Sequence, residues 1–179
     1  MKTSAFRGGY NKGEMNMGLF DIFKKKPAAA PVIGACAAGK VVAMADIPDE
    51  VFSQGILGPC VGIEPVDGNV YAPCDGTISQ LTDTLHAIGL TGVLGAEILI
   101  HCGVDTVAMN GEGFTNTVKE GQEVKKGDLI LTMDLDKVRA AGHPTTIMTI
   151  VTNADDYASV ETIAEGDIAL GADLLKLTK

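Results

Sequence analysis

The sequence predicts an all-β fold, an antiparallel β-sandwich or a hybrid of barrel and sandwich, and three observations carry this prediction. Short runs rich in Val, Ile and Leu recur about every ten residues, a spacing typical of strands in such folds. Turn sequences of the DG, NG and KKGD kinds separate the runs. The segments ACAAGKVVAM (35–44) and APCDGTISQL (72–81) share the frame A-x-x-x-G-x-[VI]-x-x-[ML], which indicates an internally duplicated hairpin motif.

The strands are expected where the apolar runs lie between turns. They are placed at KVVAM (40–44), VGIEPV (61–66), NVYAP (69–73), GTISQL (76–81), AEILIH (96–101), DLILTMDL (128–135) and TTIMTIV (145–151). The segment DLDKVRAAG (134–142) has instead the pattern of a short helix that ends at Gly142. We therefore expect at most one or two short helices in the fold.

The first 31 residues are expected to form a flexible segment ahead of a single domain at residues 32–179. MGLFDIFKKK (17–26) places apolar residues at helical spacing before three lysines, a pattern typical of a short amphipathic helix in weak contact with a membrane surface. A frayed tail is an equal alternative, since so short a helix is marginal in water. PAAAP (27–31) indicates a stiff linker, because proline restricts itself and the residue before it.

Composition and charge exclude several classes of function. The net charge of −9 and the pI near 4.7 argue against nonspecific nucleic-acid binding, which needs a cationic surface. No apolar span is long enough to cross a bilayer. The four cysteines form no CxxC pair and no secretory signal precedes them, so we expect reduced cysteines and a cytoplasmic protein.

Two near-matches to known motifs lack a residue that the chemistry needs. GACAAGKV (34–41) approaches a phosphate-binding loop, but Val41 stands where a metal-binding hydroxyl is required. The segments at 70–81 and 118–134 resemble the hairpins of biotinyl and lipoyl carrier domains, but no lysine stands at a hairpin tip in the motif of those carriers. His143 lies beside a helix end and a proline, and is interpreted as a capping or surface residue rather than a ligand.

The segment EILIHCGVDTV (97–107) places a histidine inside an apolar run. In a strand side chains alternate, so Ile100 and Cys102 are expected on one face and His101 on the other. His86 begins a second apolar segment, HAIGL, and a hairpin between the two segments would bring the histidines together. In such a pair one imidazole can act as a nucleophile while the other donates a hydrogen bond. The alternative is two half-buried histidines whose partners are backbone groups.

The segment GAEILIHCGVDTVAMNGEGF (95–114) resembles the phosphorylation-site signature of the glucose-family enzyme IIA of the bacterial phosphoenolpyruvate:sugar phosphotransferase system. That signature is an apolar run, then H-x-G-[apolar]-x-T-[apolar] and a GEGF turn. The likeness covers about residues 30–179, with AP.DGTI, HAIGL and VKEGQEVKKGDLI in order. It implies an antiparallel β-sandwich with an intertwined duplicated motif, in agreement with the strand spacing. It also implies a phosphocarrier, a phosphotransferase component of sugar uptake.

The resemblance implies roles for individual residues. His101 stands at the histidine that accepts the phosphoryl group through Nε2, and His86 at the partner histidine that holds a phosphoryl oxygen. Thr84 matches the threonine that orients the pair, Gly103 the glycine that lets a partner approach, and Asp105 an acidic residue near the site. Six further residues match an apolar docking patch, with ordinary core as the alternative for each: Val51, Phe52, Ile56, Leu57, Leu99 and Val107.

Cys102 departs from the family pattern, in which a larger aliphatic or aromatic residue is usual between the histidine and the glycine. By the alternation of side chains this substitution should change packing rather than chemistry. It also leaves a thiol near the site, where oxidation would matter.

Partners follow from the same resemblance. The expected donor is HPr, a small histidine-phosphorylated carrier whose basic rim suits this acidic protein, and the expected acceptor is the cysteine of the IIB domain of a membrane sugar permease. No cofactor or metal is required, although His86 and His101 could share a zinc ion with a partner protein. A monomer is expected, because the site must face successive partners.

Three alternatives come from other classes of function. The first is a regulatory binding protein whose phosphorylation state is read by transporters or metabolic enzymes. The second is a zinc peptidase on a related β scaffold, which needs an H-x-H motif that HCG lacks. The third is a biotinyl or lipoyl carrier, which the missing lysine argues against.

Overall fold

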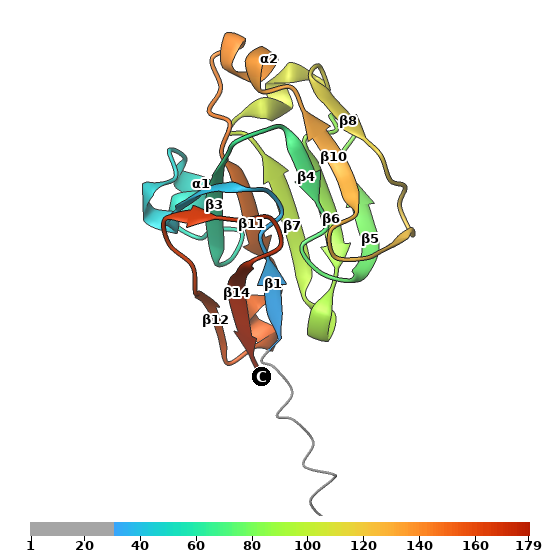
Figure 1. Cartoon of the computed structure of the whole chain (residues 1–179). Helices are drawn as coiled ribbons and strands as arrows, with labels where there is room; N and C mark the ends of the chain where they lie inside the picture. Colours follow the sequence, from blue (N-terminus) through green and yellow to red (C-terminus); the bar gives the residue numbers. More distant parts are fainter. Residues whose placement is uncertain (1–30) are drawn as a thin grey trace, which may run out of the picture.

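The computed structural model describes residues 31–179, which form three antiparallel sheets and two short α-helices (Figure 1). The predicted fold class, an antiparallel all-β architecture with one or two short helices, is confirmed. The predictions for residues 1–30, including the helix at 17–26, lie outside the described residues.

The largest sheet has eight strands in the order β13-β2-β3-β11-β7-β6-β5-β9. They are β2 (Gly39–Val42), β3 (Cys60–Pro65), β5 (Gly76–Leu81), β6 (Ala87–Thr91), β7 (Glu97–Cys102), β9 (Glu123–Val124), β11 (Ile147–Val151) and β13 (Asp167–Ile168). Two three-stranded sheets have the orders β1-β14-β12 and β4-β10-β8. Their strands are β1 (Val32–Gly34), β4 (Asn69–Tyr71), β8 (Phe114–Asn116), β10 (Leu129–Met133), β12 (Ser159–Thr162) and β14 (Asp173–Thr178). Each of the seven predicted runs overlaps one of these strands.

The predicted duplication is present in the backbone. Gly34 N–H donates to the Pro73 carbonyl over 2.9 Å, and Tyr71 N–H donates to the Cys36 carbonyl over 2.8 Å. Each bond is the counterpart of the other under the shift that aligns the two similar segments. The sheets obey the same relation, since β1-β14-β12 corresponds to β4-β10-β8 and the large sheet is symmetric about its central β11 and β7 pair. The two halves therefore interlock.

Glycine is needed at the same place in both halves. A Cβ at Gly39 would overlap the backbone oxygen of Glu64, and a Cβ at Gly76 would overlap that of Thr91. At these points β2 and β5 approach their neighbours so closely that no side chain fits. The shared glycine of the two segments is thus a packing requirement.

One large apolar core fills the space between the eight-stranded sheet and the two smaller sheets. A second cluster lies on the opposite face of the eight-stranded sheet, because its β3 and β11 members alternate with core residues: Ile47, Phe52, Cys60, Val104, Met148 and Ile150. We call this set the second cluster. β11 is therefore buried on both faces along its whole length.

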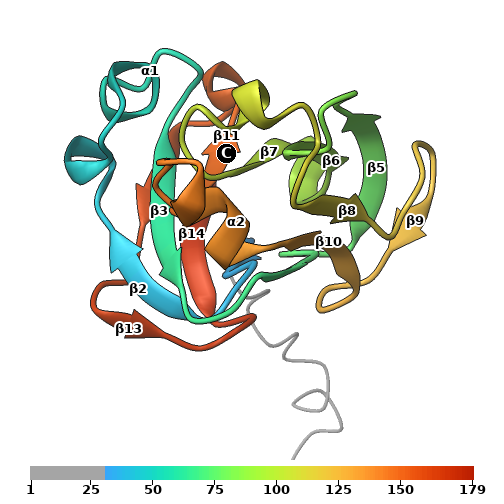
Figure 2. The same cartoon turned by 90° about the horizontal axis from the view of Figure 1, so that it is seen from above.

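The helix α2 (Leu135–Ala140) forms where the sequence predicts it. Asp134 accepts a backbone N–H of the first turn over 3.1 Å, and Gly142, with φ of 86°, follows the last turn. His143 N–H donates to the Val138 carbonyl of the helix over 3.1 Å, so its backbone caps the last turn, in line with its interpretation as a capping or surface residue. α2 lies at one end of the sandwich, at the top in Figure 1 and over the sheets when seen from above in Figure 2.

The sequence patterns do not predict α1 (Glu50–Ser53), which lies in the long connection between β2 and β3. The Asp49 carboxylate accepts the N–H groups of Val51 and Phe52 over 2.8 and 3.2 Å, and so satisfies the free donors of this single turn. α1 lies beside β3 at the side of the molecule in both views (Figures 1 and 2). It carries Phe52 onto the second cluster.

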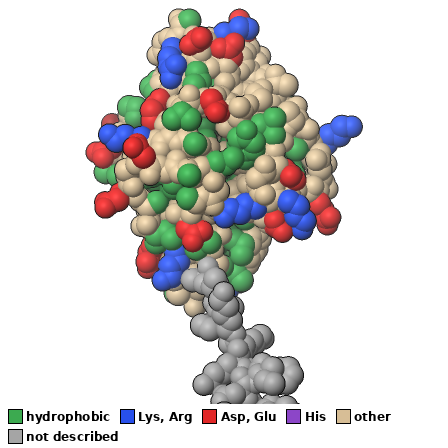
Figure 3. All heavy atoms as spheres, viewed as in Figure 1, with side chains coloured by type: hydrophobic (Ala, Val, Ile, Leu, Met, Phe, Trp, Pro, Cys, Tyr) green, Lys and Arg blue, Asp and Glu red, His purple; other side chains and the backbone are tan. Residues whose placement is uncertain are grey.

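The surface carries charges of both signs. On the face shown in Figure 3, acidic and basic side chains lie near one another around the margin, with apolar side chains between them. One exposed ion pair joins Lys125 and Asp75 over 3.1 Å. Within residues 31–179, no helix is long and apolar enough to cross a bilayer.

Candidate active site

The two histidines meet on the face of the eight-stranded sheet that carries the second cluster. β6 and β7 pair antiparallel with Ala87 opposite His101, so His86, just before β6, lies next to His101. The ring centroids are 4.7 Å apart and the rings are nearly perpendicular, at 78°. The hairpin expected from the sequence brings the pair together.

The alternation along β7 is as expected. Ile98, Ile100 and Cys102 are fully buried in the core, whereas His101 and Leu99 are half-buried on the other face. The Cys102 thiol therefore points away from His101, and burial raises its pKa well above the ordinary value. The thiol is fully buried, so Cys102 contributes to packing on the core face of β7 and does not face the histidine pair.

One hydrogen bond fixes the protonation pattern of His101. Its Nδ1 lies 2.9 Å from the Gly103 carbonyl oxygen. A carbonyl only accepts, so Nδ1 carries the proton and Nε2 keeps its lone pair. The ring therefore presents a free nucleophilic nitrogen.

His86 is held by a different partner. The Thr84 hydroxyl lies 2.7 Å from His86 Nδ1, and a hydroxyl can donate or accept there. The residue between them, Leu85, has φ of 59°, a left-handed conformation that is rare for a leucine. His86 is 7 % exposed. The predicted contact between Thr84 and the histidine pair is thus present.

Both imidazoles resist protonation. The pKa of His101 falls from 6.5 to about 4, chiefly because burial disfavours the charged ring and next because His86 lies beside it. The Gly103 carbonyl and the carboxylates of Asp49 and Asp105 act in the opposite direction. Burial is also the largest cause that lowers the pKa of His86. The His101 ring is therefore neutral near pH 7.

The loop after His101 has an unusual backbone. Gly103 has φ of 78° and Asp105 has φ of 57°. A Cβ at Gly103 would lie 3.0 Å from the Pro144 carbonyl oxygen and would overlap the Thr106 side chain. The structure thus gives a reason for this glycine beyond room for a partner: the loop itself needs it.

The six residues of the predicted docking patch divide into two groups. Four are exposed, and Ile56 is the most exposed at 66 %: Val51, Ile56, Leu57 and Val107. Leu99 is half-buried against the second cluster. Phe52 is only 6 % exposed, and its ring packs on His101 with centroids 4.9 Å apart. Phe52 therefore lies beneath the histidine rather than on the docking surface.

Sequence reasoning missed two features of the site. Asp49 is not among the predicted site residues, although an aspartate directly before a short apolar segment is a helix-start signal. Its carboxylate lies close enough to raise the pKa of His101. Met148 of β11 lies opposite His101 and belongs to the second cluster. No sequence pattern predicts that β11 pairs with β7, so the position of Met148 opposite His101 could not be predicted.

No group of three or more His, Cys, Asp or Glu side chains that could hold a metal ion occurs in the described part of the chain.

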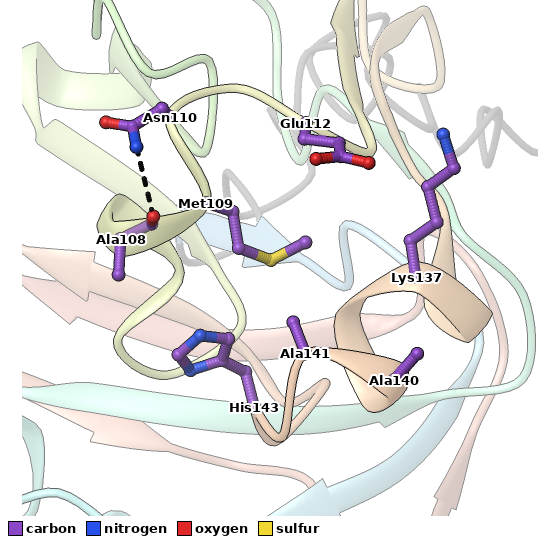
Figure 4. Close-up of a pocket in the computed structure, with 8 residues that line it drawn as sticks. All are labelled: Ala108, Met109, Asn110, Glu112, Lys137, Ala140, Ala141 and His143. Atoms are coloured by element: carbon purple, nitrogen blue, oxygen red, sulfur yellow. Dashed lines mark hydrogen bonds between the residues drawn. The ribbon is translucent and has the colours of Figure 1, made fainter.

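An open pocket of about 590 Å³ lies away from the pair, between the 3-10 turn η4 (Thr106–Met109) and α2 (Figure 4). Its lining residues are Ala108, Met109, Asn110, Glu112, Lys137, Ala140, Ala141 and His143. In Figure 4 the Met109 side chain extends from η4 into the space between the two elements. None of the predicted site residues lines this pocket.

A model of the family described as phosphoenolpyruvate-dependent sugar phosphotransferase system, EIIA 1, matches residues 32–157. This range includes every predicted site residue and all of the hairpin that carries the histidine pair.

Individual relatives agree. A β-glucoside-specific EIIBCA component from Dickeya chrysanthemi is 42% identical over 140 residues, 78% of this chain and 22% of the relative. A glucose-specific EIICBA component from Streptococcus pneumoniae is 41% identical over 139 residues, 78% of this chain and 19% of the relative. The chain thus spans about a fifth of the length of these relatives. The solved glucose permease IIA from Mycoplasma capricolum matches with a TM-score of 0.73 and 29% identity, over 81% of this chain and 94% of that one.

Proposed function

The chain belongs to the EIIA 1 family of the phosphoenolpyruvate-dependent sugar phosphotransferase system, and from this premise we propose that His101 is the residue that carries its phosphoryl group. Membership makes the protein a phosphotransferase component and a phosphocarrier of that system. The observation that supports His101 as the carrier is its neutral ring, held by Gly103 through Nδ1 with Nε2 free.

The proposed transfer takes place between His101 and a phosphorylated histidine of the donor. The Nε2 lone pair of His101 forms a new N–P bond while the donor's P–N bond breaks, and that bond's electron pair stays on the donor nitrogen. The His101 ring then takes on positive charge, which the Gly103 carbonyl stabilises through the Nδ1 hydrogen bond. The reverse steps release the phosphoryl group to an acceptor.

His86 is proposed to hold the phosphoryl group rather than carry it. With the Thr84 hydroxyl donating to Nδ1, the His86 proton stays on Nε2 and can donate to a phosphoryl oxygen. The ring centroids are 4.7 Å apart, which supports the proposal that this donor reaches a phosphoryl group on His101. The Asp105 carboxylate lies close enough to the His101 ring to raise its pKa, and so would favour the positive charge that the His101 ring gains on phosphorylation.

The exposed apolar residues around the pair are proposed as the docking surface. Val51, Ile56, Leu57 and Val107 would be covered by each partner, and the seal would keep water from the phosphohistidine. The proposed donor is HPr, and its basic rim would suit a chain of net charge −9. The proposed acceptor is a IIB cysteine, since the relatives are named EIIBCA and EIICBA components.

We propose that this exchange takes place in the cytoplasm, where these partners would meet the chain. We also propose that the chain acts as a monomer and needs no cofactor. A zinc ion is proposed only in a complex, where a partner would add ligands to His86 and His101.

The test is intact mass after incubation with phosphoenolpyruvate, enzyme I and HPr. Wild type and His86→Ala should each gain one acid-labile phosphoryl group, and His101→Ala should gain none. The wild-type protein should then lose the group to a IIB domain, whereas His86→Ala should release it at least about tenfold more slowly. Phosphorylation of His101→Ala would overturn the assignment of the carrier. No phosphorylation of folded wild type would overturn the carrier role and favour a regulatory protein that acts through binding alone.

A further inference from the structure

A glutamate on β3 is joined to the segment that enters β11. The Thr145 hydroxyl donates to Glu64 Oε1 over 2.5 Å, and the Thr146 hydroxyl donates to Glu64 Oε2 over 3.0 Å. Both threonines are buried, at 3 % and 4 % exposure, whereas the glutamate is exposed. Buried hydroxyls need a partner, and this carboxylate is the acceptor for both.

The same segment holds the loop that follows His101. Gly103 N–H donates to the Thr146 carbonyl over 2.9 Å, and Val104 N–H donates to the Pro144 carbonyl over 3.1 Å. The Gly103 carbonyl in turn accepts the His101 Nδ1 proton over 2.9 Å. Three hydrogen bonds, joined through the covalent frames of Thr146 and Gly103, therefore link the Glu64 carboxylate to the His101 ring at the ends of the neighbouring strands β3, β11 and β7 (Figure 1).

The loop depends on such external support. Asp105 has a left-handed backbone, a conformation that a residue other than glycine keeps only where surrounding contacts hold it, and Gly103 begins the same turn. The contacts that hold Gly103 come from residues 144–146, and Glu64 fixes the two hydroxyls of that segment. If the segment moves, the Gly103 carbonyl moves with it.

We propose that Glu64 is a positioning residue for phosphoryl transfer, which acts through Thr146 and Gly103 to keep the proton of His101 on Nδ1. This rests on the proposed function, since it deepens the role given to His101. A ring that loses the Gly103 carbonyl is free to carry its proton on Nε2, and in that form Nε2 has no lone pair for the attack. Glu64 touches neither ring and no reacting atom, so its effect is on the fraction of reactive His101.

A direct contact between Glu64 and a partner is the competing explanation, because Glu64 lies on the same sheet face as the histidines. Thr146 separates the two explanations. It is buried and out of a partner's reach, yet it is an essential link in the proposed set of hydrogen bonds. A positioning role therefore predicts that substitution of Glu64 and substitution of Thr146 have the same effect on the His101 tautomer and on the rate of transfer.

The first measurement is the tautomer of His101, from the nitrogen shifts of its ring in the isolated protein at pH 7. Glu64→Ala and Thr146→Val should both shift the ring from the Nδ1–H toward the Nε2–H form, while Thr146→Ser should resemble wild type. Glu161→Ala is the matched control, since Glu161 of β12 also accepts a hydroxyl, that of Ser159, over 2.8 Å. This control should leave the tautomer unchanged.

The second measurement is the rate of transfer from phospho-HPr. Glu64→Ala and Thr146→Val should lower kcat about three- to tenfold with KM unchanged, and the double variant should lose no more than either single one. A raised KM for Glu64→Ala alone would overturn the proposal in favour of a partner contact. An unchanged tautomer in both variants would overturn it as well. The tautomer is measured on the isolated protein, so it tests the role of Glu64 even if the wild type is not phosphorylated. Failure of the proposed function can therefore be told apart from failure of this proposal.

Discussion

The reactivity of the site is set by the protonation of one ring. His101 is neutral because burial removes the water that would stabilise its charge, and its tautomer is set by a single carbonyl oxygen. The sequence predicts the pair and its alternation, since strand geometry alone puts His101 and Cys102 on opposite faces. It does not predict the tautomer, because that depends on the left-handed turn at Gly103.

The lowered pKa predicts how stability depends on pH. The folded pKa of about 4 lies below the ordinary 6.5, so between these values the unfolded chain binds a proton that the folded chain does not. Stability is therefore full above pH 6.5 and falls as the pH drops toward 4, by up to about 1.4 kcal/mol per pH unit for this residue. His101→Gln should remove that part of the loss, as measured by urea unfolding at pH 7, 5.5 and 4.5. The ring proton signals of His101 should stay unshifted down to about pH 5, and a midpoint near 6.5 would contradict the prediction.

At the scale of elements, the two halves supply side chains to the site from corresponding connections of different length. The β5 to β6 turn supplies Thr84 and His86, whereas the longer β2 to β3 connection forms α1 and supplies Phe52. The sequence predicts α2 from its helical pattern and the glycine that ends it, and the structure adds the Asp134 cap at its start. A single turn such as α1 has too few residues for periodicity, so the sequence leaves both core and docking patch open for Phe52, and the structure buries it.

The division of the docking patch makes a paired prediction. Phe52→Ala removes a buried ring from the second cluster and should lower the free energy of unfolding by about 3 kcal/mol. Ile56→Ala removes an exposed side chain and should change it by less than about 0.5 kcal/mol, while the KM for phospho-HPr rises severalfold. Denaturant unfolding and transfer kinetics of both variants measure this. Equal destabilisation by the two substitutions would show that the division is wrong.

At the scale of the whole molecule, the fold follows from local pattern and the site from long-range pairing. The seven apolar runs and the shared frame predict the central strands and the duplication. The edge strands β9 and β13 have two residues each and show no alternation, so no pattern could find them. The link from Glu64 to His101 exists because β11 lies between β3 and β7 in the sheet. Local sequence patterns predict strands but not their order, so this link could not be predicted.

The duplication predicts that its two halves respond alike to the same change. Gly39→Ala and Gly76→Ala each place a Cβ against a backbone oxygen of the neighbouring strand, which cannot turn aside as a side chain can. Each should lower the free energy of unfolding by about 2–3 kcal/mol, in urea melts at pH 7. Gly121→Ala is the control, because φ is 78° there but nothing lies within 4 Å, so only backbone strain of about 1 kcal/mol remains. A large loss of stability from only one of the two substitutions would mean that the two halves share a hydrogen-bond pattern but differ in how closely their strands pack.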